Sequence, residues 1–341
     1  MKKILVSLIA IVGLLSSCTN DDIKIANEIA FTINPATVVE NLEELEPGEL
    51  TVLPDGRKVS VQLFVYDKEG LLVAKDSRDM SDYSHLMTST QNLPEGEYTV
   101  VASTHIKNNT GDNYWLFSNT DNINTFSIKD DGYIHEQLGI LGLSTKKVTI
   151  TENTKEVKLD IKMAGALAFV FYGDIHYHDE IVNAYKLASN KLSEEIHLDS
   201  YGEIMYSYKS ESDYAFRISR LKPSDYKNYD NIYSYIFLFP MKNVKLCFAA
   251  ELGTDKNYDN AYLGDECICD IEAGHEYGFY FFIESNKSYW EDLSTTNAPA
   301  IKAKIENTKN TKYIAPSPLM KDVQTYIQSV CDYKSVANLK R

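Results

Sequence analysis

The sequence predicts an all-β protein built from two tandem β-sandwich domains. Apolar residues mostly recur with period two, as where Val59, Val61, Leu63 and Val65 alternate with other side chains. Because successive side chains of a strand point to opposite faces of its sheet, this pattern predicts half-buried strands. Polar turns separate these runs, and segments with a helical pattern are few. Short strands between polar turns are typical of a β-sandwich.

Strands are expected in both halves of the chain, with a boundary at residues 163–165. A weak internal repeat supports two related halves, because residues 93–98 and 271–277 each place a glycine turn and a tyrosine before an apolar strand. The pattern over residues 193–198 fits a strand or a helix, and the pattern over residues 319–330 predicts a short helix. The expected strands cover residues 59–66, 71–73, 98–102, 148–150, 157–161, 166–172, 233–239, 244–252, 266–271 and 277–284.

The N-terminus has the composition of a lipoprotein signal peptide. Lys2 and Lys3 precede an apolar run over residues 4–15, which is too short to remain as a membrane-spanning helix. Residues 15–18, Leu-Ser-Ser-Cys, resemble the bacterial lipobox, in which a signal peptidase cuts before a cysteine that receives fatty chains such as palmitate. Two or three such chains attach a protein stably to a membrane. We therefore expect lipidation of Cys18.

The acidic pair Asp21 and Asp22 follows the expected lipidation site. It resembles the export signal that takes Bacteroidetes lipoproteins to the outer face of the outer membrane, although an acidic pair also suits an ordinary soluble linker. We expect a lipid-anchored protein of the cell outer membrane, exposed at the surface. The expected division is a signal peptide over 1–17, a linker over 18–30, an N-terminal β-sandwich over 31–162, a C-terminal β-sandwich over 163–285, and a tail over 286–341.

The charge of the chain argues against one class of partner. Removing the signal peptide leaves 49 acidic against 32 basic residues, a net charge of −17. So acidic a chain is a poor candidate for binding nucleic acid or an anionic lipid surface through charge.

The cysteines other than Cys18 are interpreted as buried free thiols. Cys267 and Cys269 lie on the same face of an expected strand, too far apart along it for an easy mutual disulfide. Together with Cys247 and Cys331 they do not supply the paired spacing of a zinc site. A disulfide that involves Cys247 or Cys331 is the alternative, since the compartment outside the inner membrane permits one.

Two segments carry residue types that could bind a metal ion. Asp255, Asn257, Asp259 and Glu266 have the spacing of a calcium loop, with Asn260 at the usual glycine position, but strands flank them where a calcium loop has helices. We interpret this segment as a polar hairpin loop. The segment from His176 to Asp179 puts two imidazoles on one side of an extended chain without a third ligand, which favours a surface loop. We predict no metal and no cofactor.

No motif predicts an enzyme. Glu194–Glu195 and Asp265–Glu266 are adjacent pairs, and neighbours on a strand face opposite sides, so neither pair can act alone as a catalytic dyad. Nucleophile, phosphate-loop and zinc-protease motifs are missing from the sequence. The serious alternative is a surface glycan-binding lipoprotein. Residues 114–117, Tyr-Trp-Leu-Phe, and residues 289–290, Tyr-Trp, could stack on sugar rings, or could pack in a core or between domains.

Five segments carry a resemblance to a known family, and with the lipobox they span most of the chain up to about residue 285. They are residues 59–73 (VSVQLFVYDKEGLLV), 93–103 (LPEGEYTVVAS), 148–175 (VTITENTKEVKLDIKMAGALAFVFYGDI), 235–240 (YIFLFP) and 273–285 (AGHEYGFYFFIES). In order and spacing they resemble the fimbrial subunits and anchors of Bacteroidales, of the FimB and fimbrillin-A-associated anchor type.

The resemblance implies two transthyretin-like β-sandwich domains and assembly by strand exchange, in which an extended segment of one subunit completes the sheet of another. It implies a fimbrial anchor or minor subunit, with fimbrial shaft or accessory subunits as partners. In related shaft subunits an arginine-specific protease removes the N-terminal strand together with the lipid, whereas an anchor keeps both.

Arg57 is the residue at which this chain could be processed, because no arginine lies between Cys18 and Arg57. It stands in an expected turn before a strand and is therefore accessible in principle. A turn arginine with no role in processing is the alternative. Residues 311–319 are a candidate donor segment, although Pro316 and Pro318 weaken that idea because proline cannot donate to a ladder.

Overall fold

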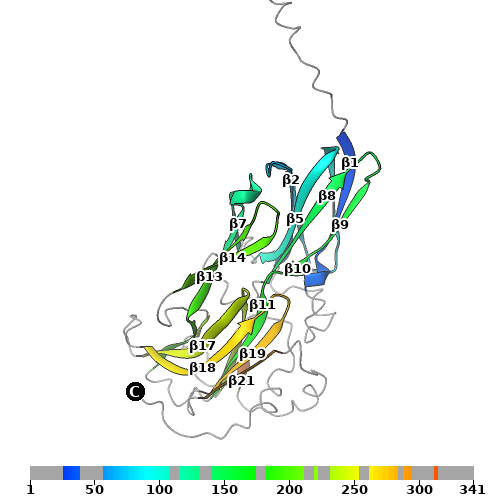
Figure 1. The fold of residues 1–341 in the computed structure, drawn as a ribbon. Coiled ribbons are helices and arrows are strands. Elements are labelled where there is room, and N and C mark those ends of the chain that lie inside the picture. The colour runs from blue at the N-terminus through cyan, green and yellow to red at the C-terminus, as the bar shows by residue number, and fades with distance from the viewer. Residues whose placement is uncertain are drawn as a thin grey trace, which may run out of the picture.

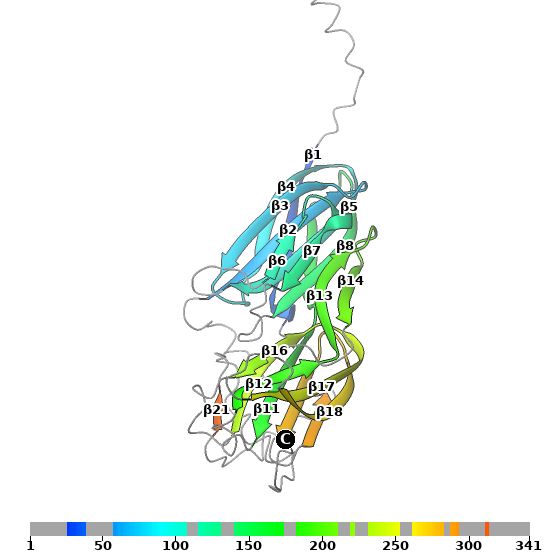
Figure 2. The ribbon, with the colours of Figure 1, turned by 90° about the vertical axis from the view of Figure 1, so that its left-hand side faces the viewer.

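The predicted all-β fold is confirmed. Apart from two short 3-10 turns, η1 (Ala36–Val38) and η3 (Ile123–Thr125), every described element is a strand. Figures 1 and 2 show two bodies stacked along one long axis. Within the described residues, no helix is long and apolar enough to cross a membrane. The computed structural model describes residues 26–38, 57–107, 115–130, 140–173, 182–210, 219–221, 231–252, 261–282, 287–292 and 311–313.

The N-terminal body is built around a five-stranded central sheet. Side chains on both faces of β2 are buried, with Val61 and Leu63 on one face and Phe64 and Tyr66 on the other. A sheet that is covered on both faces carries apolar side chains at consecutive positions, as residues 63–66 do, whereas Ser60 and Gln62 interrupt the apolar run before them. The alternation predicted a strand that is buried on one face only, and the covered second face corrects that expectation. The strand order is β10 (Lys162–Met163), β8 (Leu141–Ile150), β5 (Gly96–Lys107), β2 (Lys58–Asp67) and β3 (Leu72–Met80).

Two further sheets complete the N-terminal body. The ring of Phe64 stacks on that of Phe117, with 6.2 Å between the ring centroids. Phe117 belongs to β6 (Trp115–Ser118), so the sheet that contains β6 lies against the β2 face that carries Phe64. The first sheet has the order β4 (Met87–Pro94), β1 (Ala26–Asn34) and β9 (Glu156–Asp160). The other has the order β14 (Ile204–Ser210), β13 (Lys191–Leu198), β7 (Ser127–Asp130) and β6 (Trp115–Ser118). The β13–β14 hairpin, from the second half of the sequence, therefore belongs to the N-terminal body.

The C-terminal body consists of two sheets with a separate buried cluster between them. Ala168 and Val170 of one sheet belong to the same cluster as Leu246 and Phe248 of the other. The first sheet has the order β20 (Lys287–Asp292), β19 (Glu276–Phe282), β11 (Ala166–Gly173), β16 (Asn231–Leu238) and β21 (Thr311–Tyr313). The second has the order β15 (Ser219–Leu221), β12 (Val182–Ser189), β17 (Met241–Leu252) and β18 (Ala261–Ile271).

Several expected boundaries need correction. The linker predicted over residues 18–30 is too long, because β1 already begins at Ala26. The ambiguous residues 193–198 form part of strand β13. The tail predicted over residues 286–341 contains β20, which pairs along its whole length with β19. The helix predicted over residues 319–330 lies outside the described residues. The division into sandwich domains at 31–162 and 163–285 stays a prediction.

Candidate functional site

The first candidate site is the place of β1 in its sheet, which we call the β1 seat: β1 with its neighbours β4 and β9. β1 lies in the middle, antiparallel to β4 and parallel to β9. Ile29, Phe31 and Ile33 are fully buried in the main core, while the intervening residues of β1 are partly exposed. Burying each of these three side chains is worth roughly 1.5–3 kcal/mol. The N-terminal strand is thus a structural part of this body.

The chain leaves the β1 seat through a tight turn at η1. Asn34 Oδ1 accepts a hydrogen bond from the amide of Ala36 at 3.2 Å, and Thr37 Oγ1 donates to the Ile161 carbonyl at 2.6 Å. Val38 is buried against Gly142 of β8, where an added Cβ would lie only 2.4 Å from Val38 Cγ2 and 2.5 Å from Ile161 Cγ2. Glycine at residue 142 is therefore what lets η1 pack on the central sheet.

Arg57 occupies a different environment from the one expected. It directly precedes β2 and is only 8% exposed, so it is not an accessible turn residue in the folded chain. A protease that recognises an arginine side chain needs that side chain and its flanking backbone to be reachable. Cleavage after Arg57 stays a prediction, and it requires local opening beside the central sheet.

Aromatic side chains join the two bodies. The ring of Trp115, on β6, lies 5.8 Å from Phe237 and 5.3 Å from Phe239, both of the C-terminal body. Tyr206 of β14 lies 5.7 Å from Phe239 and donates its hydroxyl hydrogen to the Ala164 carbonyl at 2.7 Å. Burial raises the pKa of Tyr206 to about 12. The tryptophan weighed as a glycan platform is therefore a junction residue, 2% exposed.

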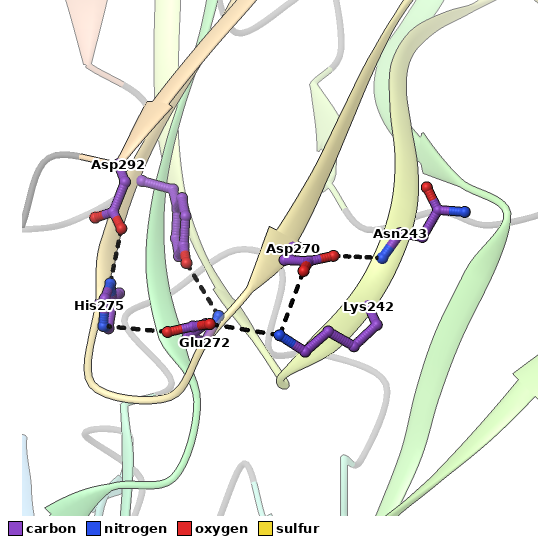
Figure 3. A network of polar contacts seen from close by, with 7 residues as sticks. Lys242, Asn243, Asp270, Glu272, His275 and Asp292 are labelled. Carbon is purple, nitrogen blue, oxygen red and sulfur yellow. Dashed lines mark hydrogen bonds and ion pairs between the residues drawn. The ribbon is translucent and has the colours of Figure 1, made fainter. Parts of the chain in front are cut away.

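A polar network lies beside this junction, around the β18–β19 turn (Figure 3). Lys242 Nζ lies 3.3 Å from Asp270 and 3.4 Å from Glu272. His275 Nδ1 lies 2.8 Å from an Asp292 carboxylate oxygen, which ties the turn to β20. Backbone bonds also fix the turn to the connection between the bodies, since the amide of Gly274 donates to the Gly165 carbonyl at 2.7 Å.

An open cavity of about 690 Å³ separates this turn from the N-terminal body. Lys162, Tyr206 and His275 line it, together with hydroxyls of β8. Its walls come from both bodies. The ion pairs of Lys242 with Asp270 and Glu272 are exposed to solvent, and exposed pairs contribute little to stability.

The cysteines are confirmed as free thiols within the described residues. Cys247, Cys267 and Cys269 are buried and unbridged. Burial raises the pKa of each of these thiols, to about 11 for Cys267 and about 12 for the other two. Cys331 lies outside the described residues.

Several of the predicted site residues lie outside the part of the chain that the structure describes. These are Cys18, Asp21 and Asp22, together with residues 176–179 and 255–260. Glu266 is exposed on β18, where its carboxylate lies 3.5 Å from Lys245 Nζ. Glu195 of β13 pairs with Lys129 at 3.2 Å, and hydrogen bonds and this charge lower its pKa in spite of partial burial. In the part of the chain that the structure describes, no group of His, Cys, Asp and Glu could hold a metal ion.

Two of the aromatic residues that the sequence suggests as sugar platforms pack against other rings, and Tyr114 lies outside the described residues. Trp115 is buried, and Phe117 packs between Phe64 and Phe126. Trp290 on β20 is 40% exposed. The most exposed large aromatic side chain among the described residues is Tyr201, at 66%, in the β13–β14 turn. Sequence alone gave no reason to select it among 24 tyrosines.

No protein-family model and no curated protein matches the sequence. Solved structures do match, each over most of this chain. A candidate adhesin from Bacteroides thetaiotaomicron is 11% identical with a TM-score of 0.46, and the match covers 80% of this chain and 98% of that one. A fimbrial assembly protein from Parabacteroides distasonis is 11% identical with a TM-score of 0.40, covering 80% and 98%. The fimbrial anchor protein Mfa2 from Porphyromonas gingivalis is 12% identical with a TM-score of 0.40, covering 79% and 98%. The solved structures that this chain resembles thus include fimbrial and adhesin proteins.

Proposed function

We propose that this protein is a lipid-anchored subunit at the base of a fimbria, held in the outer membrane by Cys18 and exposed at the cell surface. The observation that carries the proposal is the position of β1. Its apolar side chains close the main core, and the nearest arginine after Cys18 is buried. The folded chain is therefore suited to keep its N-terminal strand, and with it the lipid.

A subunit that keeps β1 can take only one role in strand exchange. Its β1 seat is filled by its own strand, hydrogen-bonded to β4 on one side and β9 on the other. It can therefore donate a strand to a neighbour but cannot accept one in this place. A subunit with that property terminates an assembly, as an anchor does.

The donor segment in this proposal is the C-terminal region that begins with residues 311–319. Thr311–Tyr313 already form a short strand, β21, which runs parallel to the first three residues of β16. Three pairs give few hydrogen bonds, so this segment costs little to detach and pair elsewhere. The proline residues at 316 and 318 would end such a pairing.

The test is co-purification from the native bacterium. Fimbriae sheared from cells and from membranes are probed for this protein by mass spectrometry, in cells with the full chain and in cells with a chain that ends at residue 310. We expect the full chain to accompany membrane-attached fimbriae, and the truncated chain to stay in the membrane without them. Equal recovery of fimbriae with both chains would contradict donation by the C-terminal region.

A further inference from the structure

A second cavity lies in the N-terminal body, farther along β8 than the part that lines the first cavity. Its volume is about 370 Å³, and its walls are the ends of β2, β5 and β8 with the β13–β14 turn. The hydroxyl of Tyr98, which lines it, donates to the Pro94 carbonyl at 2.9 Å, and Pro94 lies opposite Ala26 in the sheet. The cavity is thus close to the point at which β1 begins, at the top of Figure 1. We call it the tip pocket.

The lining of the tip pocket mixes donors and acceptors. Asp67 and Glu97 supply carboxylates, Lys68 and Lys147 supply amines, and Thr99 and Ser200 supply hydroxyls. Two negative and two positive groups balance, so the pocket has no excess charge for a phosphate or a metal ion. Such a lining suits an uncharged ligand with many hydroxyl groups, each of which can donate and accept.

Tyr201 stands at the rim of this pocket, next to Ser200. Its side chain is 66% exposed, yet its backbone is firmly held. Asp199 Oδ1 accepts hydrogen bonds from the amides of Tyr201 and Glu203, each at 2.8 Å. The Asp199 amide donates to the Glu203 carbonyl at 3.0 Å, which closes the turn. A ring presented by a locked turn loses little conformational freedom when a ligand binds.

The β13–β14 turn also packs against the wall of the tip pocket. Gly202 has φ +78°, and a Cβ at this position would lie 2.7 Å from Thr99 Cγ2. Lys147 Nζ lies 4.7 Å from the centre of the Tyr201 ring, a cation–π distance, and Lys147 itself lines the pocket. The exposed ring and the polar pocket are therefore parts of one surface.

We propose that the tip pocket binds a saccharide. The ring of Tyr201 provides a flat apolar platform for the C–H face of one sugar ring. The carboxylates and hydroxyls of the pocket form hydrogen bonds with the hydroxyl groups of that sugar or of its neighbour. The site differs from the aromatic pairs that the sequence suggested, because it joins an exposed, immobilised ring to a cavity of hydrogen-bonding groups.

The position of the pocket indicates where the saccharide comes from, and this step rests on the proposed lipidation of Cys18. Seven residues separate Cys18 from Ala26, and a fully extended chain spans about 3.5 Å for each residue. The tip pocket therefore lies within a few tens of ångströms of the membrane. The saccharide of the cell's own outer-membrane lipid is the ligand within reach, and a free polysaccharide of other origin is the alternative source.

The test is binding of the mature chain, with Cys18→Ser for solubility, to two named probes. One is the polysaccharide released from the lipopolysaccharide of the producing bacterium, and the other is a panel of soluble glucan, mannan and xylan. Titration calorimetry gives the dissociation constants. The variants are Tyr201→Ala, which removes the platform, and Gly202→Ala, which displaces the turn. Trp290→Ala removes an exposed aromatic on β20 and is the matched control.

We expect saturable binding that Tyr201→Ala weakens at least about tenfold, that Gly202→Ala also weakens, and that Trp290→Ala leaves unchanged. Binding to the first probe supports the membrane source, and binding only to the panel assigns the same pocket to a free polysaccharide. Absence of binding to every probe, or equal binding by Tyr201→Ala with unchanged melting temperature, would overturn the proposal. The outcome is independent of the anchor role, since this assay involves neither lipid nor fimbriae.

Discussion

Phe31 of β1 lies opposite Val157 of β9 in a parallel pair, although most of the N-terminal body separates them in sequence. The first strand of the fold is thus paired with one that is synthesised much later. Such long-range pairing forms slowly because a long loop must close first. The main core is closed only when the chain's own N-terminal strand is in place.

Strand β1 should contribute strongly to the free energy of unfolding of the protein. Phe31→Ala removes a fully buried ring, and we expect it to lower the free energy of unfolding by about 3–5 kcal/mol. Glu28→Ala, on the exposed part of the same strand, should change it by less than about 0.5 kcal/mol. Urea denaturation followed by circular dichroism measures both. A small effect of Phe31→Ala would show that β1 is not integral to the core.

Gly142 provides a test of the packing of η1. Gly142→Ala places a methyl group 2.4 Å from Val38 Cγ2, and we expect a loss of about 1–3 kcal/mol from overpacking. The double variant Gly142→Ala with Val38→Ala removes one source of the clash and should recover part of that loss. If the two single losses simply add in a double-mutant cycle, the two residues do not contact each other in solution.

The junction between the bodies is tested at neighbouring residues of β6. Trp115→Ala should destabilise the protein by about 3–5 kcal/mol, because Trp115 is packed between Phe237 and Phe239. Leu116→Ala, at a side chain that is 49% exposed, should have little effect. Differential scanning calorimetry should also show a single transition for the parent and two for Trp115→Ala. A single unshifted transition for that variant would mean that the ring does not couple the bodies.

The carboxylate of Asp82 makes the stability of the folded protein depend on pH in the acidic range. Burial raises its pKa, but hydrogen bonds from the Ser84 hydroxyl, the Ser81 hydroxyl, the Ser84 amide and His85 outweigh burial and lower it from 3.8 to about 2. Because the pKa is lower in the folded chain, the carboxylate stabilises the fold above pH 4, and this contribution is lost as the pH falls from about 4 to 2.

The Asp82→Asn variant isolates that contribution. We expect it to be about 2–3 kcal/mol less stable than the parent at pH 6, with the difference narrowing as the pH falls below 4. Urea denaturation at a series of pH values measures the difference. Its control is Asp76→Asn, in an exposed position of β3 whose carboxylate accepts a hydrogen bond from the adjacent Ser77 amide. A difference that does not depend on pH would contradict the account.

The buried thiols should be inert in the folded protein. Burial raises the pKa of Cys267 to about 11 and that of Cys269 to about 12, so thiolate is scarce at pH 8. We expect iodoacetamide to leave Cys247, Cys267 and Cys269 unmodified in native protein and to alkylate them in urea, as read by mass spectrometry of peptides. Rapid alkylation under native conditions would show that this part of the C-terminal body opens readily.

The strands could be predicted from sequence where one physical rule dominates. The alternation of Val59, Val61, Leu63 and Val65 predicted a strand correctly, but it predicted burial on one face only, and the sheet that covers the other face could not be inferred from it. Residues 26–30 carry the weaker pattern Ala-Asn-Glu-Ile-Ala, and only their pairing with β4 and β9 makes them a strand. Tertiary pairing thus overrides a local pattern that is close to that of a linker.

The sites were harder to predict for the same reason. Trp115 stands in an aromatic run that favours a sugar platform and Tyr201 does not, and only the fold shows that Trp115 is enclosed by Phe237 and Phe239 while Tyr201 is exposed. Arg57 looked accessible because it follows a Pro-Asp-Gly turn pattern. It is buried in the folded chain, which no local pattern reveals.

The central claim is that the mature protein keeps both its lipid and β1. Intact-mass spectrometry of protein extracted from the native outer membrane tests it most directly. The account predicts a chain that begins at an acylated Cys18 and retains Phe31. A chain that begins at Lys58, with no lipid and no residues of β1, would contradict it.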